Sequence, residues 1–129
     1  MPSESLSAQK TGLGLFLATQ PTTAVFLFAL LHFLGLSIAI LLTQPTLNLD
    51  VLEQIAWSRD PQWAYAKHPP LPAWIMGAIM WMSGNKPWAA ALLGPAASAL
   101  ALPIVWCLAR RMVDAGRALI AVFLLVDRI

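Results

Sequence analysis

The sequence is poor in charge. Of its 129 residues only 11% are Asp, Glu, Lys or Arg, whereas 59% are hydrophobic. A soluble globular domain carries roughly 25% charged residues, so this composition, with a mean hydropathy of +0.71, indicates a membrane protein. The net charge of +2 comes from a few basic residues near segment ends, without the dense basic patch that nucleic-acid binding requires. We therefore expect no nucleic-acid partner.

Several recognisable motifs are also missing. The single cysteine, Cys107, lies in an apolar run and can form no internal disulfide. The sequence contains no phosphate-binding glycine loop, no dinucleotide-binding fingerprint, no zinc-ligand spacing and no G-x-S-x-G elbow. These absences argue against nucleotide-driven transport, hydride transfer and serine hydrolysis within this stretch of chain.

Two uncharged stretches are long enough to cross a membrane as helices. Residues 24–42 would extend about 28 Å and residues 88–108 about 31 Å, close to the ~30 Å of a bilayer's hydrocarbon. We predict membrane spans over residues 23–43 and 88–109, the second in spite of two prolines. A cleaved signal peptide is the alternative for the first stretch, although its apolar core is normally only about 7–15 residues long.

His32 stands in the middle of the first predicted span. A polar ring at that depth needs a partner on another helix or a water-filled cavity. Two interpretations remain open: a neutral histidine that is hydrogen-bonded across a helix interface, or a catalytic group.

Residues 44–87 lie between the two predicted spans and should form a loop with juxtamembrane helices. Asp50 and Glu53 have the three-residue spacing of a helix-starting capping box, which predicts a short helix to about Arg59. That helix should lie along the membrane surface, with Trp57 as an anchor. A second apolar helix at residues 71–83 is either a short span or a surface helix.

The arginines indicate the orientation of the chain. Residues 1–22 begin polar and are predicted to be a cytoplasmic tail, with a short interfacial helix near Gly12–Ala18. Three arginines follow the second span, and short cytoplasmic loops are enriched in Lys and Arg. Two full spans place the arginines inside, whereas three would place them outside; residues 50–70 are outside in both cases. Residues 110–129 should be a cytoplasmic turn and the start of a truncated span, so we expect a fragment.

Seven of the 16 Asp, Glu, Lys, Arg and His residues lie between the two predicted spans. Charged groups held against a bilayer are costly, so such a cluster is a candidate functional site. Its members are Asp50, Glu53, Lys67 and His68. A helix cap is the plain structural explanation of the two acids. For the neighbouring Trp63 and Tyr65, membrane anchoring and contact with substrate are equally good explanations.

Four short segments surround these residues: Leu49-Asp50-Val51-Leu52-Glu53, Trp57, Trp63-Ala64-Tyr65 and Lys67-His68-Pro69-Pro70-Leu71-Pro72-Ala73-Trp74. Together they resemble the first outer loop of the family 39 glycosyltransferases, bacterial relatives of the protein O-mannosyltransferases and of the lipid A aminoarabinose transferases. The resemblance extends over about residues 23–126, which correspond to the opening part of a typical member. Many members carry Asp-Glu at the start of the motif, whereas Val51 follows Asp50 here.

The resemblance implies an all-α membrane protein, the N-terminal part of a C-type glycosyltransferase (GT-C) fold with two to three spans plus juxtamembrane helices. It implies transfer of a sugar from a polyprenyl-phosphate donor to an acceptor at the outer face of the bacterial inner membrane. Asp50 would be the general base for the acceptor hydroxyl, while Lys67 and His68 would hold the leaving phosphate. Glu53 and Tyr65 would contact substrate.

A divalent metal on Asp50, Glu53 and His68 is compatible with those ligand types, but the spacing is not diagnostic and no other cofactor is expected. We expect the 129-residue chain alone to be inactive, because the C-terminal spans of the full-length enzyme should wall the lipid groove. The alternative from another class is a small non-enzymatic membrane accessory or assembly protein.

Overall fold

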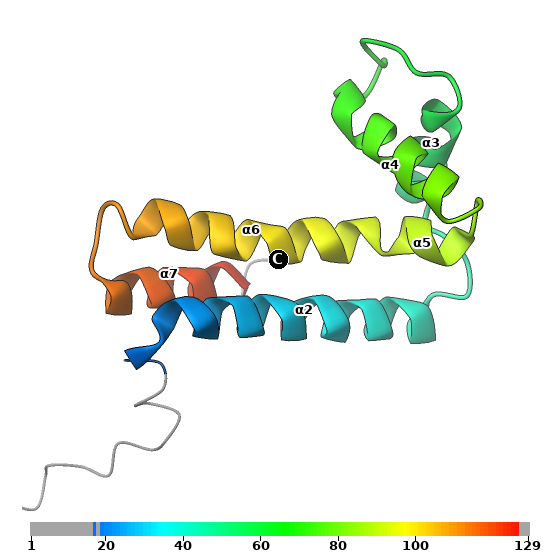
Figure 1. Ribbon diagram of the computed structural model, residues 1–129. Coiled ribbons are helices and arrows are strands. Elements are labelled where there is room, and N and C mark those ends of the chain that lie inside the picture. Colours follow the sequence, from blue (N-terminus) through cyan, green and yellow to red (C-terminus); the bar gives the residue numbers. More distant parts are fainter. Residues whose placement is uncertain (1–16, 18, 127–129) are drawn as a thin grey trace, which may run out of the picture. The chain divides into compact units, whose positions relative to one another are not determined.

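The computed structural model describes residue 17 and residues 19–126, and every regular element there is an α-helix (Figure 1). The all-α fold class is therefore confirmed. The chain divides into two compact units, His32–Ala99 and Met1–Leu31 with Leu100–Ile129. The predicted tail over residues 1–22, with its interfacial helix, lies almost entirely outside the described residues.

Helix α2, Pro21–Thr43, corresponds to the first predicted span. Pro21 is its first residue, a position where a missing backbone N–H is harmless, and Pro45 follows its end because proline cannot continue the helix. The 23 residues would extend about 34 Å. Within an apolar 18-residue stretch of this helix, only 17% is buried inside the protein. The core helix of a water-soluble fold is mostly buried.

The second predicted span is interrupted. The sequence predicts one continuous stretch over residues 88–109, whereas the structure contains α5, Pro87–Ala91, and α6, Leu93–Ala109, separated by Leu92. Pro95 accounts for the break, because it has no N–H to bond the carbonyl of Ala91 four residues earlier. Helices α5 and α6 together, Pro87–Ala109, are still apolar and long enough to cross a membrane. Within an apolar 18-residue stretch of them, 22% is buried inside the protein.

Helix α7, Ala115–Val126, belongs to the same unit as the first part of α2 and the last part of α6. Asp114 is the N-cap of this helix, because its Oδ1 accepts the backbone N–H of Arg117 at 3.1 Å. This hydrogen bond lowers the pKa of the Asp114 carboxyl. The core of this unit is formed by Val25, Ala29, Leu102, Trp106, Ala118, Leu119 and Val122. The first part of α2, the last part of α6 and α7 therefore pack together.

The other unit contains two short helices, α3, Leu49–Ser58, and α4, Pro70–Met82, close to where the sequence predicts them. They pack closely: a Cβ at Gly77 in α4 would lie 3.4 Å from the Ser58 side chain at the end of α3. The buried core of the unit is Met76, Met80 and Ala90. Figure 1 shows α3 and α4 lying side by side.

The start of α3 differs from the prediction. Helix α3 begins at Leu49, and the Oδ1 of Asn48 accepts the Val51 N–H at 2.9 Å. Asn48 is therefore the N-cap, and the predicted capping box of Asp50 and Glu53 is wrong because the helix starts one residue before Asp50. Both carboxylates lie within the helix and remain available for other contacts.

His32 contacts a polar side chain on a second helix, as the sequence predicts. Its Nε2 lies 2.8 Å from the Ser98 hydroxyl of α6, within the His32–Ala99 unit. This contact supports the structural interpretation of His32, a polar link between two apolar helices. The hydroxyl of Ser37, which is also on α2, is buried and has no hydrogen-bond partner among the described residues.

A double-mutant cycle tests the His32–Ser98 link. Hydrogen bonds between membrane helices are worth about 0.6 kcal/mol on average, so His32→Phe and Ser98→Ala should each lower the thermal unfolding midpoint in detergent. Their coupling energy should be of that order. Ser37→Ala, which removes a hydroxyl without a partner, is the matched control and should not destabilise the protein. Purely additive effects of the two changes would contradict the link.

Candidate functional site

A tyrosine holds the loop after α3 against that helix. The Tyr65 hydroxyl donates to the Trp57 carbonyl at 2.9 Å and lies 3.1 Å from the Asp60 carbonyl, and it accepts the Gln62 N–H at 3.1 Å. Its ring also stacks on Trp57, with centroids 5.3 Å apart and an interplanar angle of 18°. Residues 59–66 are therefore folded back onto the end of α3.

A second set of contacts joins the same loop to α4. The Trp74 indole Nε1 donates to the Gln62 carbonyl at 3.2 Å. The ring of Trp74 also meets that of Trp63 edge to face at 5.2 Å. The loop is thus attached to both short helices, α3 and α4.

This folding brings a lysine onto the two acids of α3. Lys67 Nζ donates to Glu53 Oε2 at 2.9 Å and lies 4.0 Å from Asp50 Oδ1. The Glu53 side chain is 30% exposed, whereas that of Asp50 is 80% exposed. The hydrogen bond that Lys67 donates to Glu53, followed by the charges of Glu53 and Asp50, raises the pKa of the Lys67 ammonium. Glu53 is therefore the close partner of Lys67, and Asp50 faces solvent beside it.

His68 is the fourth predicted site residue, and its ring packs against Trp57 at 5.5 Å with an angle of 56°. Trp57 thus contacts both Tyr65 and His68 and is half-buried between loop and helix. The ring of Trp57 makes these contacts within the protein, and its role as a membrane anchor stays a prediction. Trp63, which is 86% exposed, is far more open to a membrane surface.

The predicted metal ligands do not form a metal site in the part of the chain that is described. No three His, Cys, Asp or Glu side chains among those residues are grouped closely enough to hold a metal ion. Asp50 and Glu53 instead share an ammonium group. The charge that a bound cation would supply to these acids is therefore supplied by Lys67.

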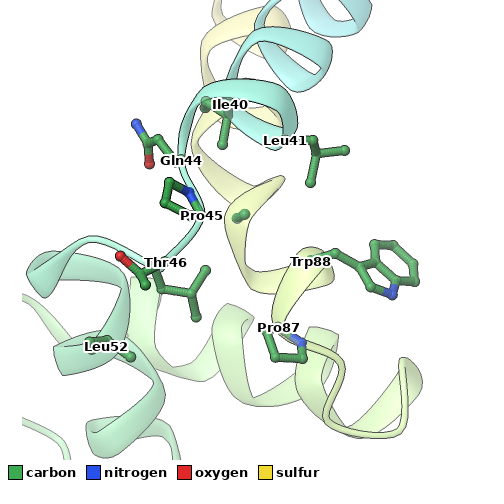
Figure 2. A pocket seen from close by; sticks show the side chains of 10 residues that line it. Ile40, Leu41, Gln44, Pro45, Thr46, Leu52, Pro87 and Trp88 are labelled. Atoms are coloured by element: carbon green, nitrogen blue, oxygen red, sulfur yellow. The ribbon is translucent and has the colours of Figure 1, made fainter.

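A hollow in the His32–Ala99 unit has a different character. It has a volume of about 460 Å³ and is lined by the end of α2, the following loop, α3 and the start of α5 (Figure 2). Its walls are mostly apolar, with Gln44 and Thr46 as the polar members and no titratable side chain. It can hold an apolar group, but it contains nothing that could transfer a proton.

Gln54 is a polar residue near the site that the sequence did not predict. This residue follows Asp50 by four positions, so both lie on the same face of α3. Its Oε1 is buried without a hydrogen-bond partner among the described residues. The four-residue spacing from Asp50 was the only sequence signal for it.

Comparison with known proteins supports the family assigned from the sequence. Residues 67–127 match the family model of the dolichyl-phosphate-mannose-protein mannosyltransferases, which confirms the resemblance to family 39. No curated protein and no solved structure matches the chain. With the two apolar helices, the match supports a membrane protein with a glycosyltransferase-like function. The matched region includes Lys67 and His68, whereas Asp50, Glu53 and Tyr65 precede it.

The charge cluster leads to a prediction about the pKa of Lys67. Glu53→Gln should lower this pKa towards 10.5, and should do so more than Asp50→Asn, because Glu53 makes the hydrogen bond. Since the pKa is raised in the folded state, the contribution of Lys67 protonation to stability is complete below pH 10.5, as long as Glu53 is ionised, and is lost as the pH rises through the raised value.

Carbon-13 NMR of the lysine Cε during a pH titration would measure this change. An effect of Asp50→Asn that equals or exceeds that of Glu53→Gln would show that the close pair has been assigned to the wrong acid.

Proposed function

We propose that this chain binds a polyprenyl-phosphate-linked sugar at the outer face of the bacterial inner membrane and serves its transfer to an acceptor hydroxyl. The observation that carries the proposal is the arrangement of three charges, with Lys67 hydrogen-bonded to Glu53 and the exposed Asp50 carboxylate 4.0 Å away. The family name, which specifies a dolichyl-phosphate-linked mannose, supports a lipid-phosphate donor.

The two acids have different roles in this proposal. Glu53 is bonded to Lys67 and orients it, which leaves Asp50 to take the proton from the acceptor hydroxyl as general base. Lys67 and His68 are adjacent in the chain and hold the lipid phosphate as it leaves. The Tyr65 hydroxyl is occupied by backbone groups, which supports a role in shaping the loop. Direct contact of Tyr65 with substrate stays a prediction.

We further propose that the 129-residue chain alone binds donor without transferring sugar. The Asp50 side chain is 80% exposed and that of Lys67 is 55% exposed, so water has free access to both. Electrostatic stabilisation of a leaving phosphate is strong only where water is excluded. Further residues that exclude water from this cluster are needed before it can catalyse sugar transfer rather than only bind the donor.

Donor binding in proteoliposomes tests the division of roles. Lys67→Ala and His68→Ala should each weaken binding of a radiolabelled prenyl phosphate hexose, with a loss of about tenfold for one charge-assisted hydrogen bond. Asp50→Asn should leave binding unchanged or strengthen it, because it removes a negative charge from beside the phosphate. Lys86→Ala, the same charge change outside the cluster, is the control and should bind donor normally.

Two results would contradict the proposal. Loss of donor binding with Asp50→Asn as large as with Lys67→Ala would make Asp50 a binding group rather than a base. Absence of donor binding by the unmodified chain would favour the non-enzymatic accessory protein. Transfer of label to an acceptor, abolished by Asp50→Asn, would show that the chain alone is active and would support the base.

The orientation of the site has a separate test. In a Cys107→Ala background, Ala64→Cys places a single thiol on an exposed part of the loop. A membrane-impermeant maleimide added to intact bacterial spheroplasts should label it, because we propose that the loop is outside. Labelling that occurs only after the membrane is opened would place the site on the cytoplasmic side and contradict the proposal.

A further inference from the structure

Gln54 carries an unexplained buried polar atom. Its side-chain Oε1 is shielded from solvent and has no hydrogen-bond partner among the described residues, a state that lowers the stability of a fold. Most buried polar groups in native proteins are paired, so each exception calls for a reason. Methionine has nearly the same shape and would fill this space without that penalty.

The surroundings of Gln54 suggest the reason. Gln54 and Asp50 both line a hollow of about 210 Å³ in the His32–Ala99 unit, and Asn48 adds a third polar side chain at the start of α3. The remaining lining residues are apolar and come from α3, α4 and α6: Val51, Pro72, Met76, Leu93, Gly94 and Ala97. The hollow is thus lined by both polar and apolar side chains.

The size of the hollow restricts what can occupy it. Pockets for drug-sized ligands measure roughly 300–1,000 Å³, so about 210 Å³ suits one small ring rather than a long chain. A sugar ring presents hydroxyl groups at its edge and C–H groups on its faces. The hydroxyls require acceptors such as carboxylate and amide oxygens, and the faces pack on apolar side chains. The hollow offers both kinds of surface.

We propose that Gln54 binds the hydroxyls of the sugar ring next to Asp50. On ligand binding, its amide turns into the hollow and Oε1 accepts a hydrogen bond from a ring hydroxyl, which supplies the partner that is otherwise missing. This inference rests on the proposed function, since it places a sugar beside the proposed base. It adds a specificity-determining residue in α3 that lies outside the motif segments and outside the family match.

The test compares a ligand that carries the ring with one that lacks it. In proteoliposomes, Gln54→Met should weaken binding of farnesyl phosphate hexose about tenfold and leave binding of farnesyl phosphate unchanged. The thermal unfolding midpoint should stay the same or rise, because the unpaired oxygen is removed. Gln20→Met, the same substitution at an exposed glutamine just before α2 that lines neither hollow, is the matched control and should alter neither binding nor stability.

Octyl hexoside, which has the ring but no phosphate, identifies the source of the sugar. A loss of octyl hexoside binding without a loss for farnesyl phosphate hexose would support the hydroxyl site and assign it to a sugar on the acceptor. Unchanged binding of both ring-bearing probes, or equal losses with farnesyl phosphate, would overturn the inference.

The proposed function can fail separately from this inference. If the unmodified chain binds neither farnesyl compound, the donor site is wrong. If it binds both equally well and Gln54→Met leaves octyl hexoside binding unchanged, the phosphate site stands but no sugar is recognised in the hollow, and the role of Gln54 is refuted.

Discussion

The return of the loop after α3 is the constraint on which the candidate site depends. Lys67 is fourteen residues from Glu53 in the sequence, and it reaches Glu53 because Tyr65 and Trp57 hold the intervening residues against the helix. The bonds of Tyr65 go to backbone groups, which fix the path of the chain whatever the neighbouring side chains are. A cluster built on such bonds is determined locally, within α3, the loop and α4.

The helices were predictable because their causes are local. Uncharged runs bounded by prolines predict α2, the α5–α6 stretch and α4 from length and composition alone. The break at Leu92 was harder to predict, because its cause lies three residues further on. Pro95 has no N–H to donate to the carbonyl of Ala91. The cap of α3 was misassigned because the spacing of Asp50 and Glu53 imitates a capping box, while Asn48 occupies the N-cap.

Less of the site could be predicted. The sequence places two acids and two cations in one stretch, but does not say which acid meets which cation, because that depends on how the loop returns. The contacts of the aromatic residues depend on the same return of the loop. Trp57 is occupied by Tyr65 and His68, whereas Trp63 is exposed. Gln54 gave almost no signal, since an unpaired buried oxygen is a property of the packed structure.

The strength of the Lys67–Glu53 pair fits the role proposed for it. The Lys67 side chain is 55% exposed, and ion pairs that face water are weak because solvent screens them. A phosphate group can therefore draw the ammonium away from Glu53 with little loss, whereas a buried pair would resist. Until then the hydrogen bond keeps Lys67 beside α3, so fewer conformations of its long side chain are lost when a phosphate binds. The pair thus orients the cation while leaving it available to a ligand.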